Sequence, residues 1–326
     1  MKLMATIPLI DPHAALIAAH PAVDALRFNT IVPRPPRWSH KNALEQLLTL
    51  CKGKPLVIDL KGRQLRVTQW ADPWFHHITL SHEIEVETPA PIYFRDSHAV
   101  IRHVDGKKIL LTDAPEKALG AGQAVNIRHP SLKVKGFLTE DDLKYREAAK
   151  ELGIHTIALS FVEQLEDITE YLDFDPKVQL WAKIENERGV EMVRKHWPSL
   201  KGRAGIMIAR GDLFENSGDD PTQYFGWEES LLAADPEAIV ASRILQSCES
   251  SPTASLEDLR ELAFHFSRGT SQIMLADGVC KSAEAFKAAA NAYLQFREYW
   301  ESREALPAEK GGSDGSRSRF WSWLRG

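Results

Sequence analysis

Two charged residues two positions apart, followed by a carboxylate on a later loop, are the chemically most informative feature of the sequence. They are Lys183 and Glu185 in WAKIENERGV, and Asp212 in GIMIARGDL. The run VQLWAKIE is short and apolar and predicts a strand, so residues 183 and 185 point to the same face. Burying both charges there costs several kcal/mol unless each has a partner. Two carboxylates beside a cation suit a divalent metal with an anionic, oxygen-rich ligand, and a buried salt bridge between strands is the alternative.

The elements that must position these residues are short apolar runs that alternate with amphipathic segments such as HKNALEQLLTLC and TEDDLKYREAAKEL. Such uniformly apolar runs are typical of buried parallel strands. Eight strands alternating with helices predict an α/β protein with a closed (β/α)₈ TIM barrel. The eight runs are Met4–Ile7, Ala25–Phe28, Leu56–Asp59, Thr156–Leu159, Val178–Ile184, Gly205–Ala209, Ala238–Ser242 and Gln272–Ala276.

Polar residues stand at the carboxyl ends of these runs. In a barrel of this class the carboxyl ends of the strands form the catalytic rim, so we expect these side chains to meet there. They are Arg27, Asn29, Asp59, Lys61, Ser160, Lys183, Glu185, Asp212, Ser242 and Asp277.

Two intervals depart from the alternation. Residues 68–136 alternate polar with apolar and predict a small β-rich insert after the third strand, placed as a lid over the rim. The expected division is therefore a barrel formed by residues 1–67 and 137–305, the insert, and a C-terminal tail of residues 306–326. The tail combines a flexible tether with an aromatic tip, Phe320 to Leu324. A frayed end, a peptide that docks a partner and a weak interfacial anchor all stay open for it.

Composition limits the class of protein. The chain has 326 residues and a net charge of −5, which gives no reason to expect binding to nucleic acid or to an anionic membrane. Its three cysteines are scattered, as expected for a reducing compartment, and argue against a disulfide framework. No run approaches the roughly 20 apolar residues of a transmembrane helix. We expect a cytoplasmic protein, and the sequence is compatible with a homo-oligomer.

The segment KIENERGVE, followed by GIMIARGDL, resembles pyruvate kinase. ALRFN, VIDLKGRQLRV, IVASRIL and QIMLADG resemble further segments of that family in the same order, from about residue 4 to residue 290. The resemblance implies a barrel with an inserted β domain and without the family's C-terminal regulatory domain. It also implies a phosphotransferase of phosphoenolpyruvate and pyruvate that uses Mg²⁺ or Mn²⁺, with ADP or ATP as the nucleotide.

The resemblance assigns roles to individual positions. It places the divalent-metal ligands at Glu185 and Asp212, and the lysine that stabilises the phosphoryl group in flight at Lys183. Arg27 matches an arginine on the phosphate, and Ser242 stands where the family has a threonine near the enolate carbon. Further implied substrate-binding groups are Arg66, Ser160 and the backbone N–H groups of Gly211 and Asp212, and the implied ligands of a monovalent cation, K⁺, are Asn29 and Asp59.

Some positions depart from the family pattern. Ile31 replaces a serine that binds potassium, and Leu60 replaces a threonine of the Asp-Thr-Lys-Gly segment. The family's Ser-Gly-Glu-Thr after the last strand becomes Ala276-Asp277-Gly278-Val279. The residues that match the family's site for enolpyruvate phosphate are all present. The parts associated with potassium, nucleotide and allosteric control depart from the family pattern.

Three functions are compatible with this pattern. The first is a divergent pyruvate kinase-like enzyme that transfers the phosphoryl group of phosphoenolpyruvate, or of an analogue, to ADP or another acceptor. The second is a metal-dependent pyruvate or enolpyruvate aldolase or lyase, since such enzymes also place a glutamate and an aspartate on successive strand ends. The third is a catalytically degenerate scaffold that binds a metabolite, with the aromatic tail contacting a partner.

Overall fold

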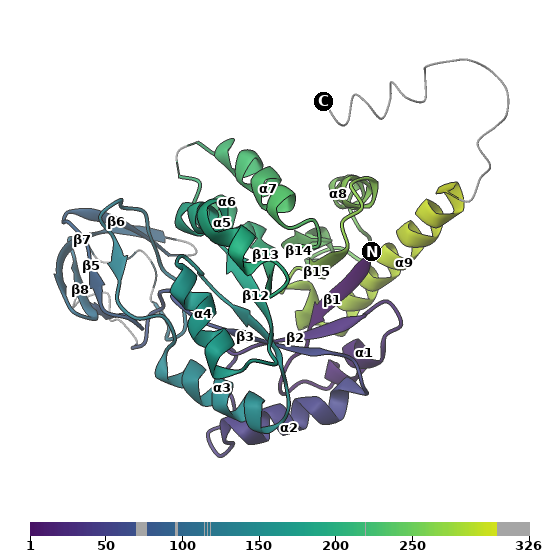
Figure 1. Ribbon diagram of the computed structural model, residues 1–326, viewed down its shortest axis with the longest axis horizontal. Helices are drawn as coiled ribbons and strands as arrows, with labels where there is room; N and C mark the ends of the chain where they lie inside the picture. The colour runs from purple at the N-terminus through teal and green to yellow at the C-terminus, as the bar shows by residue number, and fades with distance from the viewer. Residues whose placement is uncertain are drawn as a thin grey trace.

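The computed structural model describes residues 1–69, 77–94, 97–113, 115, 117, 119–218 and 220–304. Eight parallel strands close into a barrel with the order β1-β15-β14-β13-β12-β11-β3-β2, which confirms the predicted fold class (Figure 1). Each of the eight apolar runs forms one strand, with ends shifted by up to two residues. The barrel strands are β1 (Lys2–Thr6), β2 (Ala25–Asn29), β3 (Leu56–Leu60), β11 (Thr156–Leu159), β12 (Gln179–Ile184), β13 (Ala204–Ala209), β14 (Ile239–Ile244) and β15 (Gln272–Leu275).

Helices surround the barrel. The two amphipathic segments named from the sequence form α2 and α3, and the Thr139 side chain caps α3, where it accepts from Asp142 N within a capping box. The helices are α1 (Ala14–Ala19), α2 (His40–Cys51), α3 (Glu140–Glu151), α4 (Leu165–Phe174), α5 (Glu187–Leu200), α6 (Arg210–Glu215), α7 (Gln223–Ala234), α8 (Leu256–Ser267) and α9 (Ala283–Glu304), with short 3₁₀ turns η2 (Gln246–Glu249) and η3 (Val279–Lys281). None of the helices in the described part of the chain is long and apolar enough to cross a membrane.

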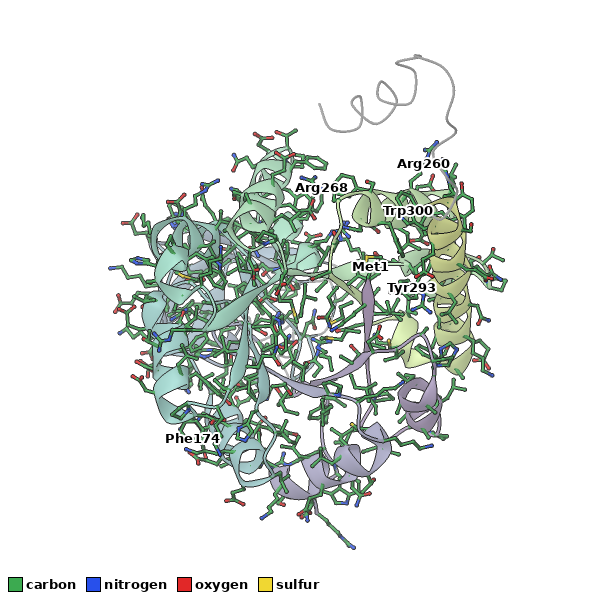
Figure 2. All side chains as sticks on the ribbon, turned by 45° about the vertical axis from the view of Figure 1, so that its right-hand side comes forward. Met1, Phe174, Arg260, Arg268, Tyr293 and Trp300 are labelled. Carbon is green, nitrogen blue, oxygen red and sulfur yellow. The ribbon has the colours of Figure 1, made fainter. Side chains whose placement is uncertain are left out.

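Apolar side chains pack on both faces of the barrel sheet. A small inner cluster includes Met4, Met207 and Met274, and the larger cluster packs the outer strand faces against the helices. Helix α9 also ties the two ends of the barrel together, because Tyr293 donates a hydrogen bond to the carbonyl of Met1 at the start of β1 (Figure 2). Both layers fix the strands whose carboxyl ends carry the polar residues.

The interval after β3 forms separate small sheets, at the left in Figure 1. One sheet has the order β4-β8-β7-β6-β9 and the other pairs β10 with β5. They have their own apolar cluster, which includes Ile78, Ile92 and Ile109. The strands are β4 (His77–Thr79), β5 (Ile84–Glu85), β6 (Ala90–Phe94), β7 (Ser97–Asp105), β8 (Lys108–Leu111), β9 (Asn126–Ile127) and β10 (Lys133–Val134). We keep the division at residues 68 and 136 as a proposal, and the tail of residues 306–326 lies outside the described residues.

Gly62 couples the loop after β3 to the end of β11. Its φ is +52°, and a Cβ at this position would collide with the backbone carbonyl of Ser160. Gly53 has a φ of +86° but nothing within 4 Å of such a Cβ. We expect Gly62→Ala to lower the free energy of unfolding by about 3 kcal/mol, against about 1 kcal/mol for Gly53→Ala, because only the first adds a backbone collision to left-handed strain.

Urea unfolding of both variants measures these losses of stability. Equal losses at the two positions would contradict the close approach of Gly62 to Ser160.

Candidate functional site

The carboxyl ends of the barrel strands surround a small polar cavity of about 370 Å³. Lys183 and Glu185, at the end of β12, and Asp212, in α6 directly after β13, all line it. The structure therefore brings these three residues together at one cavity. Asp212 also lines a larger cleft of about 770 Å³, which extends from the barrel to Tyr93 in β6 and to Arg128, directly after β9.

Lys183 is a buried cation with one hydrogen bond and two close carboxylates. Its Nζ donates to Ser160 Oγ at 2.7 Å and lies 3.2 Å from Asp59 Oδ2 and 3.3 Å from Glu185 Oε1. Burial lowers the pKa of Lys183, but the charges of Asp59 and Glu185 outweigh it and raise the pKa above its usual value. The side chain is therefore a fixed ammonium with a preset direction.

Arg27 is held between two carboxylates. Its Nε and Nη2 donate to Asp59 Oδ2 at 2.8 and 2.5 Å, and its Nη1 donates to Thr6 Oγ1 at 3.0 Å and to Asp277. Burial opposes the charged form, but Asp277 and Asp59 raise the pKa of Arg27 well above its ordinary value. Asp59 is thus the common counter-ion of Arg27 and Lys183.

Glu185 and Asp212 carry more negative charge than their surroundings neutralise. Burial raises the pKa of Glu185 to about 7, with the charge of Lys183 opposing this shift and the charge of Asp212 adding to it. Burial also raises the pKa of Asp212. No hydrogen bond or close ion pair reaches the Asp212 carboxylate from any residue that the structure describes. A divalent cation between the two carboxylates would satisfy both, so these residues fit the metal that the sequence predicts.

The donor set also limits how such a cation would be held. Among the described residues there is no cluster of three or more His, Cys, Asp or Glu side chains that could hold a metal alone. Mg²⁺ is commonly held by one or two carboxylates together with substrate oxygens and water. Glu185 and Asp212 match that arrangement, in which the bound molecule completes the coordination.

The loop after β11 orients the Glu185 side chain through a hydrogen bond. Its Oε2 accepts the Phe161 N–H at 2.5 Å. The carbonyl of Phe161 in turn accepts from Arg63 Nη1 at 3.2 Å, and Arg63 forms a bidentate pair with Asp167 at 2.6 and 2.7 Å. Sequence reasoning missed this support, because its members lie 24 to 104 positions apart along the chain.

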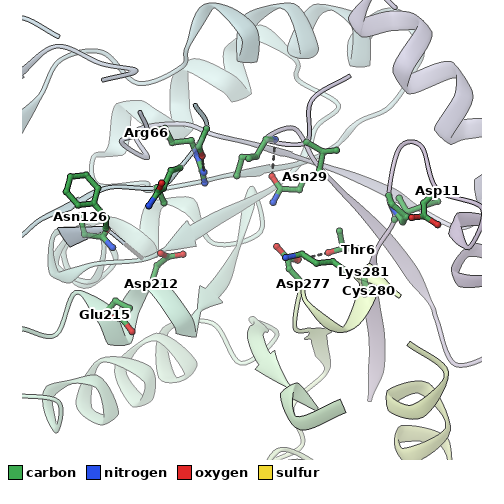
Figure 3. A pocket seen from close by; sticks show the side chains of 18 of the residues that line it. Thr6, Asp11, Asn29, Arg66, Asn126, Asp212, Glu215, Asp277, Cys280 and Lys281 are labelled. Carbon is green, nitrogen blue, oxygen red and sulfur yellow. Dashed lines mark hydrogen bonds between the residues drawn. The ribbon is translucent and has the colours of Figure 1, made fainter. Parts of the chain in front are cut away.

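Arg66 lies in the wall of the larger cleft, opposite Asp212 (Figure 3). Its guanidinium donates to the carbonyl of Gly122 at 2.5 Å and to the side chain of Gln64. Burial lowers the pKa of Arg66, and the charges of Asp212 and Glu185 oppose that shift. The structure therefore brings Arg66 to the site, partly engaged by the loop that precedes β9.

Ser242, which lines the small cavity, contacts Gly211. Gly211 N donates to Ser242 Oγ at 3.2 Å, so this N–H is not free for a substrate carboxylate in the structure. Ser242 has a φ of +73° and Arg243 one of +62°, where the pairing of β14 with β15 shifts register. This irregular backbone turns the Ser242 hydroxyl towards α6.

The two residues expected at a monovalent cation have other partners. Asn29 Oδ1 accepts the backbone N–H of Ile31 at 3.1 Å, and the Asp59 carboxylate is engaged by Arg27 and Lys183 and accepts from Ser160 Oγ at 3.1 Å. Potassium binding remains a prediction from the resemblance.

Comparison with known proteins gives one consistent family. Residues 85–286 match the family model described as pyruvate kinase, barrel domain. Pyruvate kinase from Methanocaldococcus jannaschii is 25% identical over 78% of this chain and 60% of its own length. Pyruvate kinase from Mycoplasma genitalium is 26% identical over 57% of this chain and 38% of its own length. Pyruvate kinase from Chlamydia pneumoniae is 38% identical over 26% of this chain and 19% of its own length. The chain thus spans between about a fifth and three fifths of these relatives.

Proposed function

Because the chain belongs to the pyruvate kinase family, we propose that it binds phosphoenolpyruvate or a close analogue and transfers the phosphoryl group to ADP or another acceptor. The observation that carries the proposal is the convergence of Lys183, Glu185 and Asp212 on one small cavity beside Arg27. In phosphoryl transfer the protein chiefly positions the reactants and neutralises negative charge that spreads over the phosphoryl oxygens. Fixed cations and paired carboxylates suit that task.

Each residue has a proposed task. Glu185 and Asp212 hold Mg²⁺ or Mn²⁺, which when bound would neutralise charge on the phosphoryl and enolate oxygens. Lys183 donates to the phosphoryl oxygens in flight, and Asp59 and Ser160 keep its ammonium in place. Since these contacts exist before any ligand arrives, little reorganisation is needed at the moment of transfer.

The remaining residues surround the substrate. Arg27 and Arg66 contact the phosphate, and the Ser160 hydroxyl accepts a hydrogen bond from Lys183 that orients its ammonium. Ser242 lies on the side of the enolate, where its hydroxyl accepts from Gly211 N–H and keeps its own proton for the ligand or for water. The backbone N–H groups of Gly211 and Asp212 are proposed to bind the substrate carboxylate. That carboxylate must then compete with the Ser242 hydroxyl for the Gly211 N–H.

The direct test combines the full chain with Mg²⁺ or Mn²⁺, phosphoenolpyruvate and ADP and measures pyruvate formation. Pyruvate that depends on the metal and on ADP is the expected result. Tight binding of phosphoenolpyruvate without turnover would reject the kinase assignment and keep the binding site. Metal-dependent exchange of the methyl protons of pyruvate without any phosphate would favour the aldolase or lyase.

A further inference from the structure

Asp277, in the loop after β15, contacts the guanidinium of Arg27. The carboxylate accepts from Arg27 Nη1 and, at 2.8 Å, from Thr6 Oγ1. Its side chain is 46% exposed, whereas the other carboxylate on Arg27, that of Asp59, is 2% exposed. Asp277 lines both the small cavity and the larger cleft, and Figure 3 shows it beside Thr6 and Lys281. Of the two carboxylates on Arg27, Asp277 is therefore the one that faces the ligand space.

The donors of Arg27 are almost fully used. A guanidinium has five N–H donors, and four hydrogen bonds from Arg27 reach Asp59, Thr6 and Asp277. Both donors of Nη1 are taken, one by Thr6 and one by Asp277. An anion that enters from the cleft can therefore gain Nη1 only by displacing one of these acceptors, and the exposed one is Asp277.

Asp277 is not required to keep Arg27 charged. Asp59 already accepts from Nε and Nη2, which provides a buried counter-ion with two bonds. In the resemblance described above, the position of Asp277 is a glycine. The second carboxylate is therefore an addition of this chain, on the side of Arg27 that a phosphoryl group would approach.

The charge of the small cavity leads to the same expectation. Its lining contains as many acidic as basic side chains, so a dianion gains little general attraction there. The basic residues are Arg27, Lys183, Arg243 and Lys281, and the acidic residues are Glu185, Asp212, Glu249 and Asp277.

We propose that Asp277 is an internal competing anion, which occupies the anion position on Arg27 and must be displaced by the phosphoryl group of an incoming ligand. The inference rests on the proposed function in taking Arg27 as a phosphate contact. The need to displace Asp277 determines which ligands bind. Monoanions and free inorganic phosphate bind weakly, and a multiply charged phosphate ester that brings its own divalent cation is favoured.

The experiment is isothermal titration of the full chain with inorganic phosphate alone and with phosphoenolpyruvate plus Mg²⁺. The variants are Asp277→Asn, which keeps an oxygen acceptor for Thr6, and Asp277→Gly, which frees one of the two Nη1 donors of Arg27. Both should bind each ligand about tenfold or more tightly than wild type, equivalent to about 1.4 kcal/mol. The matched control is Glu249→Gln, which removes one negative charge from the same cavity but no partner of Arg27, and should change affinity less than threefold.

Thermal unfolding of each variant verifies that it is folded, and one folded Asp277 variant is enough for the test. Unchanged or weaker anion binding by the folded variants, or no detectable binding of any anion, overturns the inference. So does an equal gain in Glu249→Gln, because the effect would then be general electrostatics. A gain in phosphate affinity without pyruvate formation by wild type supports the inference and counts against the proposed function. Pyruvate formation by wild type without a gain in phosphate affinity in the Asp277 variants supports the proposed function and overturns the inference.

Discussion

Replacing Lys183 by methionine is expected to lower kcat for pyruvate formation by about 10³-fold or more. The ammonium is the buried cation between Asp59 and Glu185, and methionine keeps the approximate length of the side chain without donating a hydrogen bond. Charge that develops on the phosphoryl oxygens would then lack its fixed donor. Initial rates at saturating phosphoenolpyruvate, ADP and Mg²⁺ measure the effect, and KM should change far less than kcat because the other contacts remain.

The control for this variant is Lys195→Met, which removes a lysine with 68% side-chain exposure that lies 3.8 Å from Glu191. It should keep both activity and stability, because an exposed ion pair contributes little. Lys183→Met should also be less stable than wild type in urea, because two buried carboxylates lose a partner. Retention of more than a tenth of wild-type kcat by a folded Lys183→Met protein would contradict its proposed role.

The fold and the convergence of the central residues could be predicted because both follow from local patterns. The alternation of side chains along a strand places Lys183 and Glu185 on one face, and Asp212 follows the neighbouring strand, β13. In a parallel barrel all strand ends of one direction meet at one rim. The two-residue alternation along a strand and the order of the strands along the chain were therefore sufficient to place these residues near one another.

Helices α1, α6 and α7 lack such a pattern. Helix α7 carries an internal Gly226 and apolar or aromatic residues around much of its circumference, so its sequence has little amphipathic contrast. Helices α1 and α6 have six residues each, too few for a period to be recognised. Their positions depend on packing against the barrel rather than on their own sequence.

The partners of Arg27 could not be predicted for a different reason. Asp59 is 32 positions away and Asp277 is 250 positions away, and the barrel brings them together only by closing β1 against both β2 and β15. A list of rim residues contains Asp277 but does not say which cation it contacts. Pairing across a closed sheet is a property of its register, which individual strands do not encode.

The second large effect is expected for Glu185→Gln, which should abolish the stabilisation of the protein by oxalate with Mg²⁺. Oxalate mimics the enolate of pyruvate, and at about 100 times its Kd it should stabilise wild type by roughly 2.7 kcal/mol. For a chain of this length that corresponds to a rise in Tm of about 4 °C. Thermal unfolding with oxalate and Mg²⁺, each alone and both together, measures the shift. Only the combination should stabilise wild type, because Glu185 and Asp212 need the ligand oxygens to complete the coordination.

The variant without ligand provides the decisive internal control. Glutamine keeps the size of Glu185 and an oxygen that accepts from Phe161 N–H, and it removes a charge that burial already disfavours, as the pKa of about 7 indicates. The ligand-free variant should therefore be about as stable as wild type, so that loss of the oxalate response cannot come from misfolding. Glu191→Gln, on the exposed side of α5, should keep the full response. A normal oxalate shift in Glu185→Gln would remove Glu185 from the metal site and leave Asp212 without a second carboxylate.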